Sequence, residues 1–183
     1  MLVLVVGPSG AGKDTLLAGA QAELGADARF RFVRRDITRP LEAGGEVHRA
    51  VSVAQFEAVR EAGGYALSWG AHGLLYGIPA DIGADVAAGV VVVANVSRGV
   101  IAEAEGRFQV MVLEITAPAA MLAARLAARG REVAGDIAAR LARRVEVPAG
   151  MEVVEVVNDG SVAAGVGRVL AALSRAAGSV RPT

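Results

Sequence analysis

Apolar residues along this chain gather in short continuous runs, and stretches with a helical pattern separate most of these runs. The runs cover residues 2–6, 30–36, 90–95, 110–115 and 153–157. The helical stretches cover residues 15–25, 118–129, 136–144 and 161–177. Short apolar runs without alternation are typical of strands buried on both faces of a sheet. Strands and helices in this order predict an α/β fold, in which right-handed crossovers join the strands of a parallel sheet flanked by helices.

Residues 37–88 interrupt this alternation. They are rich in glycine, proline and small turn residues, contain both histidines and the only tryptophan, and have one clear helical stretch at residues 53–61. A long irregular insertion between two core strands predicts a small lobe over the sheet that holds a second substrate. We therefore expect a single domain of residues 1–183, with a core of residues 1–36 and 89–183.

A glycine-rich loop follows the first apolar run directly. Residues 7–13 read Gly-Pro-Ser-Gly-Ala-Gly-Lys, and a helical pattern begins after them. Glycines allow tight turns and close backbone approach, so that successive N–H groups surround a phosphate at the positive end of the helix. A strand, GxxxxGK and a helix in this order predict a nucleoside triphosphate site. Its predicted residues are Gly7, Pro8, Ser9, Gly10, Ala11, Gly12, Lys13, Asp14 and Thr15.

Lys13 is the only lysine among the 19 lysines and arginines of the chain. An ammonium group is a compact point charge on a flexible stem, and it fits between phosphate oxygens where a planar guanidinium is too wide. A coding bias toward arginine would explain a lone lysine elsewhere in the chain, but its place in the loop favours a function. We therefore expect Lys13 to bridge the β- and γ-phosphates of ATP.

Asp14 departs from the usual pattern of such loops, in which a serine or threonine follows the lysine and its hydroxyl binds magnesium. A carboxylate offers a hard anionic oxygen that suits Mg²⁺ at least as well as a hydroxyl does. A carboxylate in the first turn of a helix also compensates the helix dipole, which is the alternative role for Asp14. We predict that Asp14 and Thr15 hold Mg²⁺ or its water ligands.

The composition limits the classes of partner. The formal net charge of the 183 residues is zero, so no global field attracts the chain to nucleic acid or to an anionic membrane. The chain has no cysteine, which excludes disulfides and thiolate chemistry. Its apolar runs are too short for a signal peptide or a membrane span. We expect a cytoplasmic protein that binds small molecules, and the sequence leaves open whether it forms a homodimer.

Several motifs together resemble guanylate-kinase-like enzymes. They are the glycine-rich loop, Thr38-Arg39-Pro40, Tyr76-Gly77-Ile78-Pro79 and Arg129-Gly130-Arg131-Glu132. Within that group the chain is similar to the ribose 1,5-bisphosphate phosphokinases of bacterial phosphonate degradation. This similarity rests on Gly12-Lys13-Asp14, residues 43–46 with His48, residues 66–69, 72–74, Asn95 with Ser97-Arg98, residues 129–132, 139–143 and 158–160.

The resemblance implies a fold, a reaction and a set of site residues. The fold is that of a three-layer P-loop NTPase, with an acceptor-binding lobe at about residues 37–88 and a helical lid at about residues 129–140. The reaction is transfer of the γ-phosphoryl group of ATP to the 1-phosphate of ribose 1,5-bisphosphate, which yields 5-phosphoribosyl 1-diphosphate. The implied catalytic residues are Lys13, Arg131 and Arg140, with Arg129 and Asn158 at ATP. The implied acceptor-binding residues are Arg39, His72, Tyr76, Ser97 and Arg98.

Each of these roles has a plainer alternative. A solvated basic surface would account for about half of the arginines, since this chain uses arginine freely. Trp69 and Tyr76 would serve equally in the core of the lobe. Asn-Asp-Gly at residues 158–160 is also a good turn sequence. Neither histidine has a partner at metal-ligand spacing.

Departures from guanylate kinases concern the acceptor. Ser68 stands where those enzymes carry a glutamate that reads guanine, and Ile78 replaces a hydroxyl residue. Leu41-Glu42 lacks their second phosphate-binding arginine. GMP is therefore expected to be a poor acceptor. Two alternatives stay open: a nucleoside monophosphate kinase, and a non-catalytic guanylate-kinase-like binding module, which the intact loop disfavours.

Overall fold

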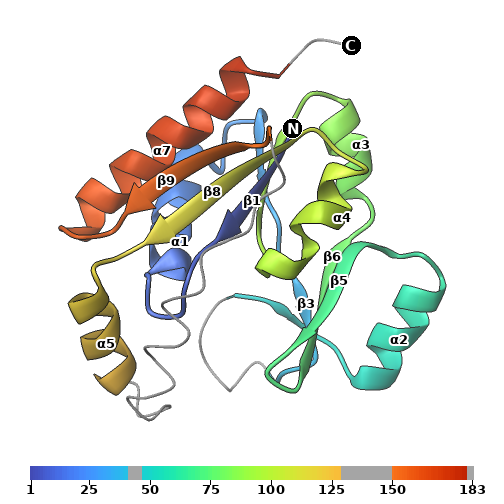
Figure 1. Ribbon diagram of the computed structural model, residues 1–183. Coiled ribbons are helices and arrows are strands. Elements are labelled where there is room, and N and C mark those ends of the chain that lie inside the picture. The colour runs from blue at the N-terminus through green and yellow to red at the C-terminus, as the bar shows by residue number, and fades with distance from the viewer. Residues whose placement is uncertain (41–46, 129–149, 181–183) are drawn as a thin grey trace.

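The computed structural model describes residues 1–40, 47–128 and 150–180. Its centre is a five-stranded parallel sheet in the order β2-β7-β1-β8-β9 (Figure 1). The strands are β1 (Leu2–Val6), β2 (Phe30–Phe32), β7 (Val91–Asn95), β8 (Val110–Thr116) and β9 (Glu152–Val157). The parallel sheet that the apolar runs predict is confirmed.

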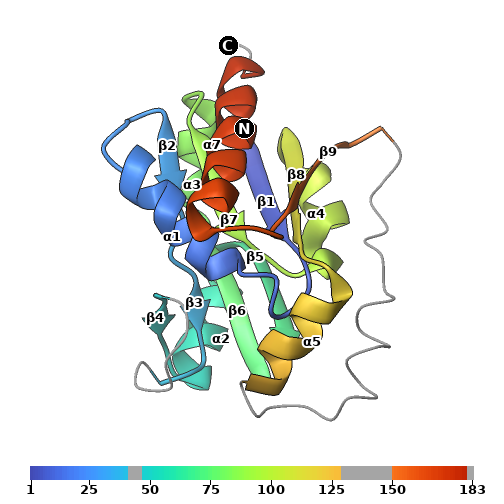
Figure 2. The ribbon, with the colours of Figure 1, turned by 90° about the vertical axis from the view of Figure 1, so that its left-hand side faces the viewer.

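The central strand β1 packs against a different layer on each face because its side chains alternate in direction. Val3 and Val5 belong to one apolar cluster, whereas Leu2 and Leu4 belong to another. The first cluster lies under α1 (Lys13–Leu24) and α7 (Val162–Gly178), and the second lies under α3 (Ile82–Ala87) and α4 (Ile101–Glu105). These helices cover opposite faces of the sheet, which gives three layers (Figure 1, Figure 2).

A second sheet lies beyond the core, mostly within the residues predicted for the lobe, and is called the lobe from here on. Its order is β4-β3-β6-β5, from β3 (Asp36–Ile37), β4 (Arg49–Ala50), β5 (Tyr65–Ala71) and β6 (Leu74–Pro79). The helix α2 (Val53–Glu61) occupies the predicted range, and a capping box between Ser52 and Gln55 fixes its start. The lobe packs directly on the core sheet, because Leu67 and Ile78 belong to the same cluster as Leu2 and Leu4.

The buried carboxylate of Asp36 ties three strands of the lobe together. It is fully buried, and it accepts hydrogen bonds from Arg49 Nε at 2.6 Å and from the Tyr65 hydroxyl at 2.8 Å. A buried charge is tolerated only when it is paired and hydrogen-bonded, and both conditions hold here. Burial and the hydrogen bond to Asp36 raise the pKa of Tyr65 above its ordinary value.

The predicted strand at residues 30–36 divides into two, and this part of the prediction was wrong. β2 ends at Phe32, and Asp36 begins β3 of the other sheet. Arg34 and Arg35 lie between them. Two consecutive guanidinium groups are too costly to bury between the sheet and its helices, so the chain leaves the core at this point.

The helix α5 (Ala119–Ala128) begins after Pro118, as predicted, and a short 3-10 helix, η2 (Arg98–Val100), precedes α4. The predicted helix at residues 136–144 and the predicted lid at about residues 129–140 lie outside the described residues. Within residues 1–40, 47–128 and 150–180, no helix has both the length and the apolar character needed to cross a membrane.

Candidate active site

The glycine-rich loop lies between β1 and α1, at the centre of the carboxyl edge of the parallel sheet. Two of its glycines are required by the local geometry. Gly7 has a φ of 143°, and a Cβ there would overlap the carbonyl oxygen of Ile115. Gly12 has a φ of 88° at the start of α1, and a Cβ there would overlap the amide of Asn158. The loop is therefore held tightly against the strands beside it.

The Lys13 side chain folds back over the loop. Its Nζ donates hydrogen bonds to the carbonyl oxygens of Gly7 at 2.8 Å and Pro8 at 3.0 Å. These bonds place an ammonium group beside the N–H groups at the start of α1, where the helix dipole also favours an anion. The structure therefore brings the predicted cation and the predicted phosphate loop together.

The β8–β9 half of the sheet supports the loop from one side. Arg125 Nη1 donates to the Gly10 carbonyl at 3.1 Å. Asn158, which is 6% exposed, donates from Nδ2 to the Ala11 carbonyl at 2.8 Å, and its backbone N–H donates to Thr116 at 2.7 Å. Asn158 thus positions the loop. Its predicted contact with ATP stays a prediction.

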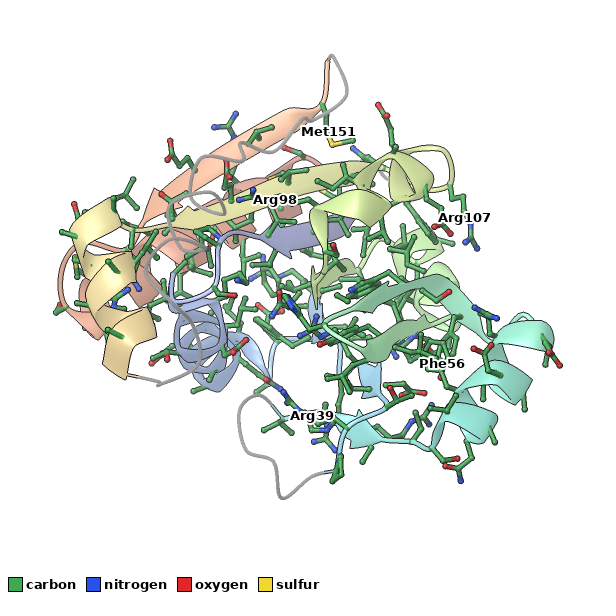
Figure 3. The ribbon with its side chains drawn as sticks, turned by 60° about the horizontal axis from the view of Figure 1, so that its bottom comes forward. Arg39, Phe56, Arg98, Arg107 and Met151 are labelled. Carbon is green, nitrogen blue, oxygen red and sulfur yellow. The ribbon has the colours of Figure 1, made fainter. Side chains whose placement is uncertain are left out.

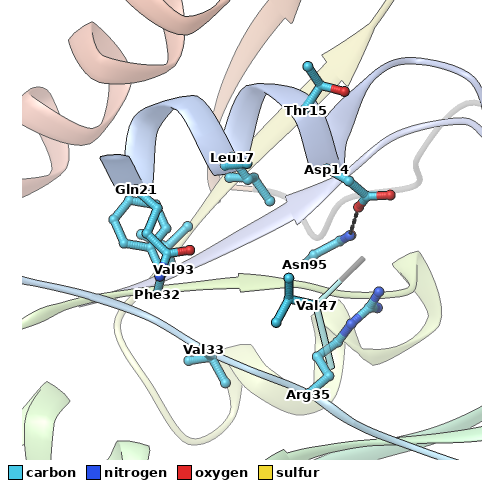
Figure 4. A pocket seen from close by; sticks show the side chains of 11 residues that line it. Asp14, Thr15, Leu17, Gln21, Phe32, Val33, Arg35, Val47, Val93 and Asn95 are labelled. Atoms are coloured by element: carbon cyan, nitrogen blue, oxygen red, sulfur yellow. Dashed lines mark hydrogen bonds between the residues drawn. The ribbon is translucent and has the colours of Figure 1, made fainter. Parts of the chain in front are cut away.

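The β7–β2 half of the sheet faces the other side of the loop. Asp14, in the first turn of α1, accepts a hydrogen bond from Asn95 Nδ2 at 3.1 Å, and Asn95 is the last residue of β7. A carboxylate with an amide beside it fits Mg²⁺, which usually takes one or two carboxylates together with substrate phosphates and water. Figure 4 shows Thr15 turned away from this pair. The described residues contain no group of three or more acidic, His or Cys ligands.

A cavity of about 320 Å³ opens on this side of the loop, between α1, β2 and β7. Figure 4 shows Asp14, Asn95 and Arg35, together with Val47, at one end, here called the polar end, and Phe32, Val93 and Gln21 at the other. Because Asp14 belongs both to the cavity and to the helix that follows the loop, a ligand in the polar end would lie next to a bound triphosphate.

Arg35 reaches the cavity from the segment between β2 and β3, and the sequence analysis did not select it. The rings of Trp69 and Tyr76 stack at 5.4 Å and are nearly parallel, at 4°. Arg35 Cζ lies 5.3 Å from the Tyr76 ring centre and 5.8 Å from that of Trp69. The signal in the sequence was the Arg34-Arg35 pair directly after a strand whose carboxyl end points to the site.

The predicted acceptor residues are spread over several places, and Tyr76 is near Arg35, which lines this cavity. Arg39 lies on the lobe beside His48, whose Nε2 is 3.0 Å from the Arg39 carbonyl oxygen (Figure 3). His72 is exposed in the turn between β5 and β6, with a φ of 52°.

Ser97 and Arg98 lie after β7, on the core. The Ser97 hydroxyl accepts a hydrogen bond from Gly99 N, and Arg98 pairs with Glu114 at 3.5 Å. These contacts fix the start of η2 and hold it to β8.

Arg129, Arg131 and Arg140 lie outside the described residues. The roles of all these residues in binding stay predictions.

No protein-family model matches the chain, but individual proteins of similar sequence carry related names. It is 50% identical over 173 residues to the ribose 1,5-bisphosphate phosphokinase of Methylobacterium radiotolerans, covering 94% of this chain and 96% of that protein. It is 51% identical over 175 residues to the bifunctional ribose 1,5-bisphosphokinase-thymidine phosphorylase of Azorhizobium caulinodans. That match covers 94% of this chain and 25% of the bifunctional protein, so the chain spans a quarter of its length.

A solved structure supports the fold. The guanylate kinase of Anaplasma phagocytophilum superimposes with a TM-score of 0.66 at 17% identity, covering 96% of this chain and 84% of that one. At this identity the likeness shows the fold alone. The guanylate-kinase-like P-loop fold implied by the sequence motifs is confirmed.

Proposed function

The chain belongs to the ribose 1,5-bisphosphate phosphokinase family, and we propose that it transfers the γ-phosphoryl group of ATP to the 1-phosphate of ribose 1,5-bisphosphate. The product is 5-phosphoribosyl 1-diphosphate. One observation carries this proposal beyond the family relationship: the phosphate loop with Lys13 opens directly on a cavity whose polar end contains Asp14, Asn95 and Arg35. That arrangement suits two phosphorylated substrates that meet end to end.

The chemistry of the transfer needs charge neutralisation more than proton transfer. The bond between the β–γ bridging oxygen and the γ-phosphorus breaks, and an oxygen of the acceptor's 1-phosphate forms a new bond to that phosphorus. A phosphate monoester has its second pKa near 6, so the attacking oxygen is already deprotonated at neutral pH. Among the described residues that line the cavity, Asp14 is the only carboxylate, and the reaction requires no general base.

Lys13 and the N–H groups at the start of α1 would stabilise the charge that develops on the transferred group. In this proposal, Asp14 holds Mg²⁺, and Thr15 would bind the ion or one of its waters only after its side chain turns toward Asp14. Bound Mg²⁺ would neutralise phosphate charge on the donor. Arg131 and Arg140 stay proposed lid residues, and a closed lid would exclude water from the site.

At the two positions where guanylate kinases bind the guanine base, this chain has residues that would not bind it. Ile78 is fully buried in the cluster between the lobe and the core sheet, so its side chain offers no hydrogen bond to a base. A serine at position 68 lacks the carboxylate that would accept from the guanine edge. GMP is accordingly the weaker acceptor in this proposal.

A side-by-side assay tests the proposal. The purified protein is incubated with ATP and Mg²⁺ and with either ribose 1,5-bisphosphate or GMP at equal concentration, and the products are identified by phosphorus NMR. We expect formation of 5-phosphoribosyl 1-diphosphate at a much higher kcat/KM than formation of GDP. A higher kcat/KM with GMP would replace the proposal by the guanylate kinase alternative, and no ATP turnover with either acceptor would favour a binding module. Sedimentation of the same sample would show whether the protein forms a homodimer.

A further inference from the structure

The proposed reaction brings a triphosphate and a second phosphate group into contact, so each side of the transfer needs its own positive charge. Lys13 supplies that charge on the side of the loop, where its Nζ lies over the carbonyl groups of Gly7 and Pro8. The acceptor side is the cavity between α1, β2 and β7. Among the described residues that line it, Arg35 alone carries a positive charge.

The location of Arg35 in the cavity indicates which part of the acceptor it would meet. Its side chain lies at the same end as Asp14 and Asn95, the end that adjoins the phosphate loop (Figure 4). The accepting phosphate must lie at that end, because it has to reach the γ-phosphoryl group. The other end is lined by Phe32, Val93 and Gln21, and none of these described residues carries a positive charge.

The stacked rings of Trp69 and Tyr76 orient the Arg35 guanidinium. Its Cζ lies within 6 Å of both ring centres, which is the range in which a ring face attracts a cation. The guanidinium is a planar fork of N–H groups, and arginine uses this fork to bind two phosphate oxygens at once. Because Trp69 and Tyr76 come from β5 and β6, the lobe sheet positions a side chain that begins between the two sheets.

We propose that Arg35 is the acceptor-side phosphate ligand, and that it binds the phosphate of the phosphorylated sugar to which the γ-phosphoryl group is transferred. Trp69 and Tyr76 act as positioning residues, because both ring centres lie within 6 Å of the guanidinium carbon. This inference rests on the proposed function, and it assigns a residue for acceptor selection that the motifs of the sequence did not indicate. The proposal also assigns a function to the segment between β2 and β3. This segment contains Arg34 and Arg35, and of these two only Arg35 lines the cavity.

The first experiment compares Arg35→Met and Arg35→Lys with Arg34→Met as the matched control. Arg34 is the adjacent, exposed arginine and does not line the cavity, so its replacement removes the same charge from the same segment. Steady-state rates are measured with ribose 1,5-bisphosphate and, separately, with varied ATP. Melting temperatures of all four proteins are measured alongside the rates.

For Arg35→Met we expect kcat/KM for the acceptor to fall by about 10- to 100-fold, the usual effect of losing a charge-assisted hydrogen bond. Part of this fall should appear in kcat, because the accepting phosphate takes part in the transition state. The KM for ATP should stay within about twofold. Arg35→Lys should recover part of the activity, and Arg34→Met should resemble the unchanged protein.

Three results would overturn the inference. Unchanged acceptor kinetics in Arg35→Met would remove the role altogether. A rise in acceptor KM with unchanged kcat would place Arg35 on the distal phosphate instead. An equal rise in the KM for ATP would assign it to the donor site. If the unchanged protein forms no 5-phosphoribosyl 1-diphosphate, the proposed function itself fails, which is a different outcome from an active enzyme that is indifferent to Arg35.

A second pair of variants tests the aromatic support independently of the arginine. Trp69→Leu should raise the acceptor KM and leave the ATP KM unchanged, whereas Trp69→Phe keeps a ring face and should restore most of the acceptor affinity. Equal acceptor kinetics in Trp69→Leu and the unchanged protein would show that the stacked rings do not position Arg35.

Discussion

Lys13 contacts the carbonyl groups of its own loop and is absent from both apolar clusters. Its replacement should therefore affect the reaction much more than the fold. We expect Lys13→Met to lower kcat by at least about 10²- to 10³-fold, the usual effect of removing one group that stabilises transition-state charge. The melting temperature should change little. Near-normal turnover by the purified variant would refute the role assigned to Lys13.

Asp14 has two candidate roles that predict different measurements. If it holds Mg²⁺, Asp14→Asn should strongly raise the magnesium concentration needed for half-maximal activity. If it only compensates the helix dipole, the variant should lose about 0.3–1 kcal/mol of stability and keep its magnesium curve. Glu23→Gln is the matched control, since Glu23 is an exposed carboxylate on the same helix. An unchanged magnesium curve in Asp14→Asn would remove the metal role.

The sequence identified site residues best where a short local motif determines the geometry. The loop and Lys13 were predicted because GxxxxGK acts over seven consecutive residues. The function of Asn158 as a support for Ala11 was missed, since that contact joins residues 147 positions apart and depends on the order of the strands. Arg35 was missed for the same reason: its two aromatic neighbours come from β5 and β6, far along the chain.

At the scale of elements, the hydrogen bonds of Asp36 hold β3, β4 and β5 together. Tyr65→Phe removes one donor to this buried carboxylate and should cost about 1–3 kcal/mol of unfolding free energy at neutral pH. Urea denaturation would measure this cost. Phe56, which stacks on the Tyr65 ring at 4.7 Å, should keep its packing because the aromatic ring is retained.

The raised pKa of Tyr65 also gives an alkaline pH dependence. In the unfolded chain the phenol loses its proton near pH 10, whereas the folded protein keeps it to higher pH. The folded state then binds more protons, so stability falls as the pH rises above about 10. Tyr65→Phe should show a shallower loss of stability over this range. Parallel curves for the two proteins would contradict the prediction.

Apart from residues 30–36, the short continuous apolar runs predicted the core strands well, because a strand buried on both faces of a sheet needs little other signal. The lobe was predicted only as an irregular insertion with one helix. Its strands β3 and β4 contain two residues each, too few to produce a period-two pattern. Burial of Asp36 and Ile37 and their pairing with β4 and β6 stabilise these two short strands.

At the scale of the molecule, the lobe and the core share one apolar cluster. We therefore expect a single cooperative unfolding transition and not two. The only tryptophan, Trp69, lies in the lobe, so its fluorescence should change at the same urea concentration as the far-ultraviolet circular dichroism of the whole chain. Ile78→Ala, at the shared cluster, should cost about 2–5 kcal/mol and shift both signals together. Separate midpoints would show that the lobe unfolds independently.

The position of Lys13 also makes the phosphate loop chemically addressable, since no other ε-amino group exists in the chain. An acylating reagent would therefore mark the loop alone among lysine side chains, and a bound triphosphate would shield it. Trypsin cleaves after an unmodified lysine and releases residues 14–29, whereas acylated Lys13 leaves residues 1–29 joined. The ratio of these two peptides in a mass spectrum would report how much of the loop was occupied when the reagent was added.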